Sequence, residues 1–415
     1  MVQPLTGTIQ PYAWGSSTFI PELLGEEPTG EPQAELWLGA HASASASLDG
    51  RPLDQVIADD PAAVVGAAAV DAFGAGLPYL LKVLAAARPL SLQAHPSREQ
   101  AEAGYAREEG AGVAADAPDR LYKDDWPKPE MLCALMDSEA LCGFREPSET
   151  FALFSQLGVA EAVELVAPLG DSYRPGADRL TEVFGRLLRL EGTDRTVVTA
   201  VSAAARALDL DADTDLALFA RTAIELGGHC GDDPGVLAAL LLNRIRLAPH
   251  QAVFLPAGNL HAYLHGGGVE IMANSDNVMR GGLTPKHVDV DELLAILDFT
   301  PGFPGLVEPV EEVPGRWRYP TPAPEFALWR LEPRETVVEL PATDLGRVLL
   351  VTDGSVVVEG GDNDLRLDRG RAAFARAGEE LLVSGTGTLF VAGPGVQVTG
   401  GEHPVGRPAQ PQPLP

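Results

Sequence analysis

LPYLLKVLAAARPLSLQAHP, residues 77–96, joins an apolar run to three polar side chains that are spaced two residues apart. The apolar residues and the Arg-Pro pair predict two β-strands joined by a turn. Side chains at positions i and i+2 of a strand share a face, so Ser91, Gln93 and His95 are predicted to point the same way. They form either a polar strip on a solvated face or the first half of a metal site.

A helix is predicted directly after this stretch. Ser97 can accept a backbone hydrogen bond as the N-cap, and Gln100 stands at the third helical position, which together make a capping-box pattern. The start of the helix therefore ends the second strand just after His95.

Length and composition indicate a soluble globular protein of two or three domains. The chain has 415 residues, of which 45% are hydrophobic and 21% charged. Its first residues lack the basic and apolar segments of a signal peptide, and the most apolar stretch, 62–87, is interrupted by charged residues, proline and glycines. The three cysteines form no CxxC pair, which is typical of inert thiols in a reducing compartment. We expect a cytoplasmic protein.

The formal net charge of -29 argues against nucleic acid and membrane surfaces as partners. An acidic protein that binds an anion must gather positive charge locally, and the rare lysines indicate where. All of them fall in the segments 77–130 and 251–290, whereas arginines are spread along the chain. The lysines are Lys82, Lys123, Lys128 and Lys286.

The chain alternates between β-rich and helical segments. Residues 1–145 mix short apolar runs with Gly/Pro turns, which favours β structure. Residues 146–246 carry helix-start signals and helical apolar spacing, including GVLAALLLNRIR after Asp233-Pro234, and predict an all-helical insert. β character returns in residues 247–318.

The remaining chain predicts a second β unit. Short apolar runs alternate with glycine turns in residues 319–400, which is typical of a β sandwich, and the tail 401–415 is predicted to be disordered. The predicted fold is therefore mainly β with an α-helical insert. Residues 1–145 and 247–318 would form the catalytic domain, with the helical domain inserted and a C-terminal β domain following.

Three pairs of polar residues repeat the i, i+2 spacing. If each pair lies in a strand, it projects two functional groups to one face. Two imidazoles, one carboxylate and one amide oxygen from these pairs make a ligand set for Zn²⁺, and with neutral histidines the ion stays electrophilic. The pairs are Gln93 and His95, Lys128 and Glu130, and His261 and Tyr263.

A glycine-bearing segment, SDNVMRGGLTPKH, adds Arg280 and Lys286. With Lys82, Lys128 and Arg98 they offer the positive field that an anionic substrate needs. GGG at residues 266–268 predicts a turn and not a phosphate cradle, because no P-loop lysine follows it. Several other residues are interpreted as structural or surface: Trp14, Trp37, His41, His229, His250, His265 and His287.

These motifs, taken in order, resemble those of type I phosphomannose isomerases, zinc enzymes of the cupin superfamily. The matching stretches cover the N-terminal half and the region after the helical insert. They are YAWGS at 12–16, ELWLGAH at 35–41, the 77–101 stretch, KPEM at 128–131, LCGF at 141–144 and LPAGNLHAYLHGGGVEIMANSDNVMRGGLTPKHVDV at 255–290.

The resemblance implies a catalytic β-jelly-roll domain, a helical insert and a second C-terminal jelly roll. It also implies one Zn²⁺ per chain, a small anionic sugar-phosphate substrate and a monomeric cytoplasmic enzyme of carbohydrate metabolism that serves GDP-mannose synthesis. The implied zinc ligands are Gln93, His95, Glu130 and His261. The implied catalytic residues are Arg280, Lys128 and Lys286, and the implied substrate-binding residues are Trp14, Ser91, Lys82, Tyr263 and Glu270.

The implied reaction is the interconversion of D-mannose 6-phosphate and D-fructose 6-phosphate through a cis-enediol. Lys128 and Lys286 are both candidates for the base, and Arg280 either stabilises the enediolate or binds phosphate. One departure stands out, since Trp126-Pro127 replaces the Asn-His that commonly precedes KPE in the family. Three alternatives stay open: an isomerase of another sugar phosphate, an iron-dependent cupin dioxygenase and a non-catalytic sugar-phosphate-binding cupin.

Overall fold

The apolar run of the opening stretch forms strand β6 (Tyr79–Ala86), which lies between the two halves of the molecule. Its alternate side chains, beginning with Tyr79, pack against the C-terminal sheet, next to residues such as Phe374 and Phe390. The other side chains, which include Leu84, face the interior of the N-terminal barrel. Burial on both faces explains why the run is almost continuously apolar.

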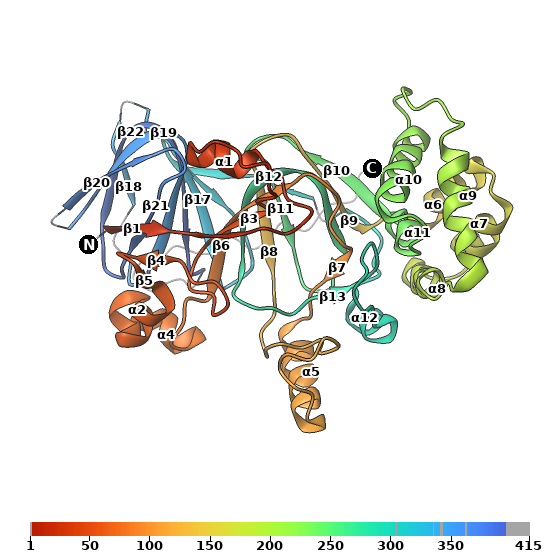
Figure 1. Ribbon diagram of the computed structural model, residues 1–415, viewed down its shortest axis with the longest axis horizontal. Helices are drawn as coiled ribbons and strands as arrows, with labels where there is room; N and C mark the ends of the chain where they lie inside the picture. Colours follow the sequence, from red (N-terminus) through yellow and green to blue (C-terminus); the bar gives the residue numbers. More distant parts are fainter. Residues whose placement is uncertain (1, 304, 335, 341–342, 362, 396–415) are drawn as a thin grey trace, which may run out of the picture.

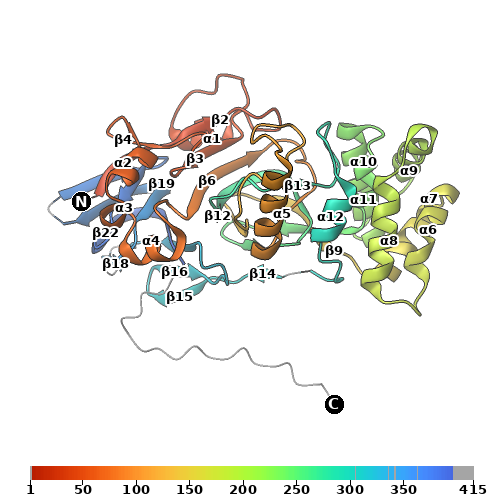
Figure 2. The same ribbon diagram turned by 90° about the horizontal axis from the view of Figure 1, so that it is seen from below.

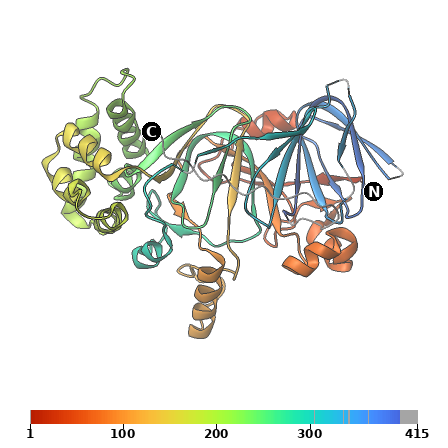
Figure 3. The ribbon, with the colours of Figure 1, turned by 180° about the vertical axis from the view of Figure 1, so that it is seen from behind.

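The structure is a computed structural model that describes residues 2–303, 305–334, 336–340, 343–361 and 363–395. The predicted tail, 401–415, lies outside the described residues. Within them, the N-terminal barrel and the C-terminal β unit lie side by side, and the helical insert covers the opposite end of the barrel (Figure 1). Helix α5 projects from the barrel by itself in Figure 1 and Figure 3, and the view from below in Figure 2 shows it in front of the barrel.

The strands of the described residues fall into two sheets. The barrel sheet has the order β14-β11-β8-β12-β6-β3-β2, with β7, β9, β10 and β13 attached beside β12. Its strands are β2 (Thr8–Gln10), β3 (Glu35–Leu38), β6, β7 (Gln93–Ala94), β8 (Glu130–Ala134), β9 (Ser138–Phe144), β10 (Leu242–Leu247), β11 (Ala252–Leu255), β12 (His261–Ala273), β13 (Met279–Arg280) and β14 (Leu306–Val307).

The second sheet has the order β15-β16-β17-β22-β19-β21-β1-β4-β5, with β18 on β22 and β20 on β19. Its strands are β1 (Val2–Thr6), β4 (Ser47–Leu48), β5 (Arg51–Pro52), β15 (Val310–Val313), β16 (Arg316–Tyr319), β17 (Ala327–Leu331), β18 (Val338–Leu340), β19 (Arg347–Gly360), β20 (Asn363–Asp368), β21 (Ala372–Ala375) and β22 (Leu381–Gly393).

Helices flank both sheets, and six of them, α6 to α11, lie in the insert. Their bounds are α1 (Phe19–Leu24), α2 (Leu53–Asp59), α3 (Pro61–Val64), α4 (Ala67–Phe73), α5 (Arg98–Ala111), α6 (Pro147–Leu157), α7 (Ala160–Leu165), α8 (Gly176–Leu188), α9 (Thr196–Ala205), α10 (Asp215–Cys230), α11 (Gly235–Ala239) and α12 (Val290–Ile296). No helix among the described residues is both long and apolar enough to cross a membrane.

The predicted mainly β fold with a helical insert is confirmed, and the predicted capping box at Ser97 is present at the start of α5. Three details differ. The helix predicted in GVLAALLLNRIR ends at Ala239, and the following residues form β10, which pairs with β9 of the barrel. β1, from the segment predicted to be catalytic, pairs with β21 of the C-terminal sheet. The division into domains stays a prediction.

The third difference concerns residues 266–268, which were predicted to form a turn and instead lie inside the long strand β12. The strand pairs with β9 before these glycines and with β6 and β8 from them onward. Gly266 has a φ of 113°, and a Cβ on Gly268 would lie 2.5 Å from the Cys133 carbonyl oxygen. The glycines thus let one strand bend and serve two parts of the barrel.

Candidate metal centre and active site

Three metal-ligating side chains meet inside the barrel. His95 follows β7, Glu130 begins β8 and His261 begins β12. The Nε2 atoms of His95 and His261 each lie 3.4 Å from one oxygen of the Glu130 carboxylate. One ligand atom from each residue falls within 4.8 Å of the others, and all three side chains are buried.

Backbone carbonyls fix which nitrogen of each imidazole faces the centre. His95 Nδ1 lies 2.7 Å from the Asn277 carbonyl oxygen, and His261 Nδ1 lies 3.1 Å from that of Asn259. Each Nδ1 therefore carries the hydrogen and donates it, which leaves the Nε2 lone pair directed at the centre. Such carbonyl contacts are the usual orienting partners of metal-bound histidines.

The centre has the properties that a divalent cation requires. Both Nε2 atoms and one oxygen of Glu130 are buried without a hydrogen-bond partner among the described residues. Burial lowers the pKa of His95 to about 4, so this imidazole is neutral near pH 7. Burial opposes ionisation of Glu130, but its interactions with His95 and with the Lys128 ammonium hold its pKa well below the usual range. Neutral imidazoles beside an ionised carboxylate form a fitting donor set for a metal ion.

The strand register brings a fourth candidate ligand to the same place. Gln93 on β7 lies directly opposite His261 on β12 and, on its other side, opposite Arg280 on β13. Directly opposed residues of antiparallel strands extend from the same face of the sheet. The Gln93 amide and the Arg280 guanidinium therefore leave the sheet beside His261.

A pocket of about 730 Å³ opens above this centre. The two histidines lie beneath its surface, with exposures of 0% and 1%. Every other residue predicted for the site lines the pocket, so the structure brings the whole set together. These residues are Trp14, Lys82, Ser91, Gln93, Lys128, Glu130, Tyr263, Glu270, Arg280 and Lys286.

The two buried lysines of the pocket have different surroundings. Lys128, in the loop before β8, places its Nζ 3.1 Å from Glu130 Oε1, at the metal centre. Lys82 on β6 lies 3.2 Å from Glu270 and 3.6 Å from Glu35, with its ammonium over the ring of Trp37. Burial alone would lower the pKa of Lys82, but the two carboxylates raise it above its usual range. Lys82 is therefore a fixed cation.

The other two predicted cations, Arg280 and Lys286, come from one segment, and its residues 283–286 also line a cleft beside the helical insert. Arg280 is half-buried, Lys286 is exposed, and within the described part of the chain neither forms an ion pair with a carboxylate. The charge of Arg280, followed by burial, lowers the pKa of Lys286. Two uncompensated cations this close together favour an anionic ligand.

Sequence reasoning missed several polar residues of the pocket wall, and it assigned Arg98, which does not line the pocket, to the site. The missed residues include Tyr12, Glu35, His41, Arg120, Asp276 and Thr284. Glu35 was not singled out, and His41, interpreted as structural or surface, lies 3.2 Å from Asp276. Glu35 and His41 belong to the quoted ELWLGAH stretch, which was the available signal. Arg98, predicted to add to the field of the site, stacks 4.9 Å from the ring centroid of Trp126 and pairs with Glu325.

A mainly β molecule with a buried centre of two histidines and a carboxylate, at the base of a barrel pocket, defines a metal-binding cupin. The comparisons narrow this class. The family model "Phosphomannose isomerase type I, catalytic domain" matches residues 2–147. The mannose-6-phosphate isomerase of Escherichia coli strain K12 is 37% identical over 399 residues, covering 94% of this chain and 98% of that protein. The human enzyme of the same name is 32% identical, covering 92% of this chain and 94% of that protein.

Solved structures agree. A zinc-bound mannose 6-phosphate isomerase matches with a TM-score of 0.87 and 34% identity, over 95% of this chain and all of that chain. The metal-free form from Salmonella typhimurium matches with a TM-score of 0.87 and 35% identity, over 95% of this chain and 99% of that chain. The chain belongs to the type I phosphomannose isomerase family.

Proposed function

We propose that the chain interconverts D-mannose 6-phosphate and D-fructose 6-phosphate. The observation that carries this proposal is the meeting, in one pocket, of the His95–Glu130–His261 centre, with Lys128 against it, and two uncompensated cations of the pocket wall. An aldose–ketose isomerisation needs a base beside the carbon that loses its proton, and a phosphorylated sugar needs cations for its far end. The solved mannose 6-phosphate isomerases described above share the fold of this chain.

The chain is a zinc protein, and Gln93, His95, Glu130 and His261 would hold the ion. The three orphaned ligand atoms and the register of Gln93 beside His261 support this set. When bound, zinc supplies Lewis-acid stabilisation of negative charge on the sugar oxygens. Glu130 Oε1 also forms an ion pair with Lys128 Nζ at 3.1 Å, so the same carboxylate orients the lysine beside the centre.

Lys128 is the proposed base. It removes the proton from C2 of the open-chain aldose, and the electron pair of that C–H bond forms the C1–C2 double bond of a cis-enediolate, with the charge on O1. A proton then moves from the O2 hydroxyl to O1, and the Lys128 ammonium returns its proton to C1, which leaves the carbonyl at C2. Its amine is nearly buried and lies against the metal centre, where the reacting carbons must sit. Lys82 is less suited to this role, because Glu270 and Glu35, which are not proposed ligands, raise its pKa. The carboxylate paired with Lys128 in the described chain, Glu130, would be shared with the metal ion.

Arg280 and Lys286 are proposed to bind the phosphate group. Both line the pocket, and both lack a carboxylate partner in the described chain. The remaining pocket residues of the predicted set, Trp14, Ser91, Tyr263 and Glu270, would contact the sugar between these two ends.

The first experiment is a coupled assay of mannose 6-phosphate conversion before chelation, after chelation and after re-addition of zinc. Activity lost to the chelator and restored by zinc supports the proposal. Full activity in zinc-depleted buffer contradicts the metal role. If the chain converts another aldose phosphate and does not convert mannose 6-phosphate, the substrate assignment changes to that sugar phosphate. If only iron restores the activity, the result favours a cupin dioxygenase.

Three further assignments belong to this proposal. The enzyme works in the cytoplasm, as a monomer, and uses the division into a catalytic domain (1–145 and 247–318), a helical insert (146–246) and a C-terminal β domain (319–400). The reducing environment suggested by the three free cysteines supports the first of these.

A further inference from the structure

The segment that carries Arg280 and Lys286 is fastened to the barrel at one end. Gly281 N–H donates to the Leu92 carbonyl oxygen at 2.8 Å, and Leu92 N–H donates to that of Gly282 at 3.1 Å. These bonds continue the pairing of Arg280 with Gln93. They fix Arg280, but they end before Lys286.

From Gly282 onward the segment packs against the helical insert. Gly282 has a φ of 109°, and a Cβ there would lie 2.5 Å from the Cα of Gly235, the first residue of α11. A Cβ on Gly235 would in turn lie 2.5 Å from the Leu283 nitrogen. Backbone therefore touches backbone, which glycine on both sides permits. Leu283 follows with a φ of 56° and buries its side chain in the core of the insert.

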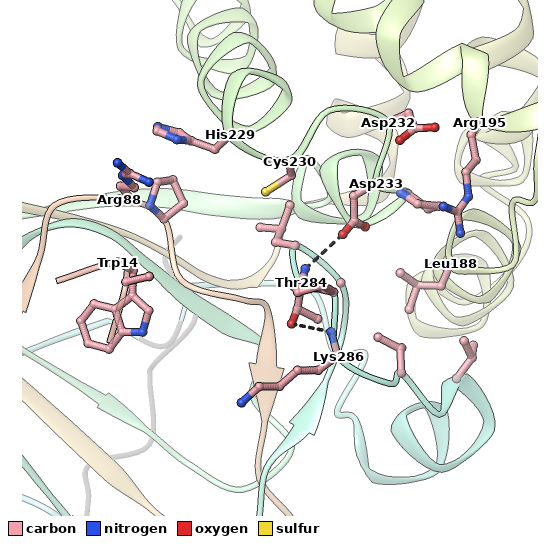
Figure 4. A pocket seen from close by; sticks show the side chains of 18 residues that line it. Trp14, Arg88, Leu188, Arg195, His229, Cys230, Asp232, Asp233, Thr284 and Lys286 are labelled. Carbon is pink, nitrogen blue, oxygen red and sulfur yellow. Dashed lines mark hydrogen bonds between the residues drawn. The ribbon is translucent and has the colours of Figure 1, made fainter. Parts of the chain in front are cut away.

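One carboxylate joins the two segments. Asp233 accepts from Gly235 N–H at 2.7 Å with one oxygen and from Thr284 N–H at 3.1 Å with the other. The Thr284 hydroxyl oxygen then accepts from Lys286 N–H at 3.2 Å. Figure 4 shows this chain of contacts, with the Lys286 side chain extending away from Asp233 toward the side of Trp14.

The same segment separates two cavities. Residues 283–286 line the active-site pocket on one side and, on the other, a cleft of about 870 Å³ between barrel and insert (Figure 4). A segment with space on both sides needs a specific contact to hold it, because packing alone does not. Leu283, with its positive φ, also needs its surroundings to maintain it.

We propose that Asp233, on the helical insert, is a positioning residue that holds Lys286 beside Arg280 for the phosphate group of the substrate. This inference rests on the proposed function. It gives the insert a direct part in substrate binding, because a carboxylate of the insert helps to hold the segment that carries one of the two phosphate-binding cations.

The test is the kinetics of Asp233→Ala with mannose 6-phosphate. We expect KM to rise about tenfold, below the roughly hundredfold that a 1 Å misplacement can cost, while kcat stays within about twofold. The inhibition constant of inorganic phosphate should rise in parallel. In Asp233→Asn the amide oxygen can accept one N–H and the amide nitrogen can accept none. The KM of this variant should therefore lie between those of wild type and Asp233→Ala. The neighbouring exposed Asp232→Asn has the same charge change and should match wild type.

A double-mutant cycle identifies the route of the effect. If Asp233 acts through Lys286, then Asp233→Ala in a Lys286→Met background should raise KM by less than about twofold further. If the two substitutions raise KM independently, so that their fold-changes multiply, the proposal is overturned. It is also overturned if Asp233→Ala lowers kcat and the melting temperature and leaves KM unchanged.

If the Asp233→Ala variant does not fold, the same double-mutant cycle is measured with Asp233→Asn. A wild-type protein that binds phosphate by titration calorimetry but turns over no mannose 6-phosphate contradicts the proposed function, and the phosphate affinity of the variants then still tests Asp233.

Discussion

Substitution of two lysines of the pocket, Lys128 and Lys286, is predicted to change different kinetic constants. Lys128→Met removes the proposed base, so kcat should fall by at least about 100-fold with little change in KM. Lys286→Met removes a phosphate contact made in both ground state and transition state, so KM should rise about tenfold with kcat nearly unchanged. Steady-state kinetics of both variants provide the check.

Arg366→Met is the control for these two variants. Arg366 lies on β20 of the C-terminal sheet, its side chain is 70% exposed, and it pairs with Asp368 at 3.1 Å. Its kinetics should resemble those of wild type. If Lys286→Met lost kcat and Lys128→Met lost only KM, the assignments of base and phosphate ligand would have to be exchanged.

The metal-free protein should lose stability between pH 6.5 and pH 4. His95 has a usual pKa of 6.5 and a folded pKa of about 4, caused first by burial, so in this window the unfolded chain binds the proton and the folded protein does not. The free energy of unfolding therefore falls as the pH falls, by about 2 kcal/mol from pH ~7 to pH ~5. Glu130, with its low pKa, adds a loss in the same direction at lower pH.

Urea unfolding of the chelated protein at several pH values measures this effect. Other groups also titrate over this range, so the informative quantity is the difference between wild type and His95→Gln. A shallower pH dependence in His95→Gln is expected, and identical slopes would contradict the assignment.

At the scale of elements, β6 contacts the C-terminal sheet by hydrogen bonds as well as by packing, through the hydroxyl of Tyr79. The Tyr79 hydroxyl accepts from Val348 N–H at 3.1 Å and lies 3.0 Å from the Ala392 carbonyl oxygen, where β19 and β22 pair. Tyr79→Phe should cost about 1–3 kcal/mol of unfolding free energy, because a buried N–H loses its acceptor. The activity should change little, since Tyr79 faces away from the pocket.

Denaturant unfolding of Tyr79→Phe, compared with Tyr173→Phe, tests this contact. Tyr173 is 97% exposed, and its variant should unfold like wild type. Equal stabilities of the two variants would mean that the hydroxyl of Tyr79 contributes nothing to the joint.

Local patterns predicted those elements whose signals are local. The capping box at Ser97 formed as the residue types require, and Thr214 caps α10 through its side chain. The strand β10 was missed because LNRIRL follows a helix without a breaker, and only pairing with β9 makes it a strand. The pairing of β1 with β21 was likewise invisible, because no local feature specifies a partner almost a whole chain away.

The candidate site shows the same limit. The i, i+2 pairs placed Gln93 near His95 and His261 near Tyr263, and the structure puts all four at one centre or its pocket. The contacts of Lys82 with its two carboxylates needed the tertiary structure, because Glu35 and Glu270 come from strands on either side of β6. Asp233 gave only a helix-start signal, and its second bond, to Thr284, depends on how the insert sits on the barrel.

At the scale of the whole molecule, zinc should raise the melting temperature. The three buried ligands come from the ends of three different strand segments, so an ion bound to them stabilises the folded state alone. Free zinc at about 1,000 times its dissociation constant adds roughly 4 kcal/mol, which in a chain of this size corresponds to a rise of roughly 5 °C. Calorimetric scans with zinc and with chelator measure it.

His95→Ala is the control for this shift. It should melt at a similar temperature to the chelated wild type and should respond little to added zinc. A zinc-induced rise of the same size in His95→Ala would place the stabilising ion elsewhere.

The pairing of β1 with β21 also sets an order of events during synthesis. Val2 opposes Ala375, so β1 leaves the ribosome long before the strand with which it pairs. The ligands of the metal centre also emerge before β21, and the barrel around them can collapse while β1 still presents an unpaired edge. A translating ribosome thus carries a nascent chain whose catalytic centre can mature before β1 has found its partner.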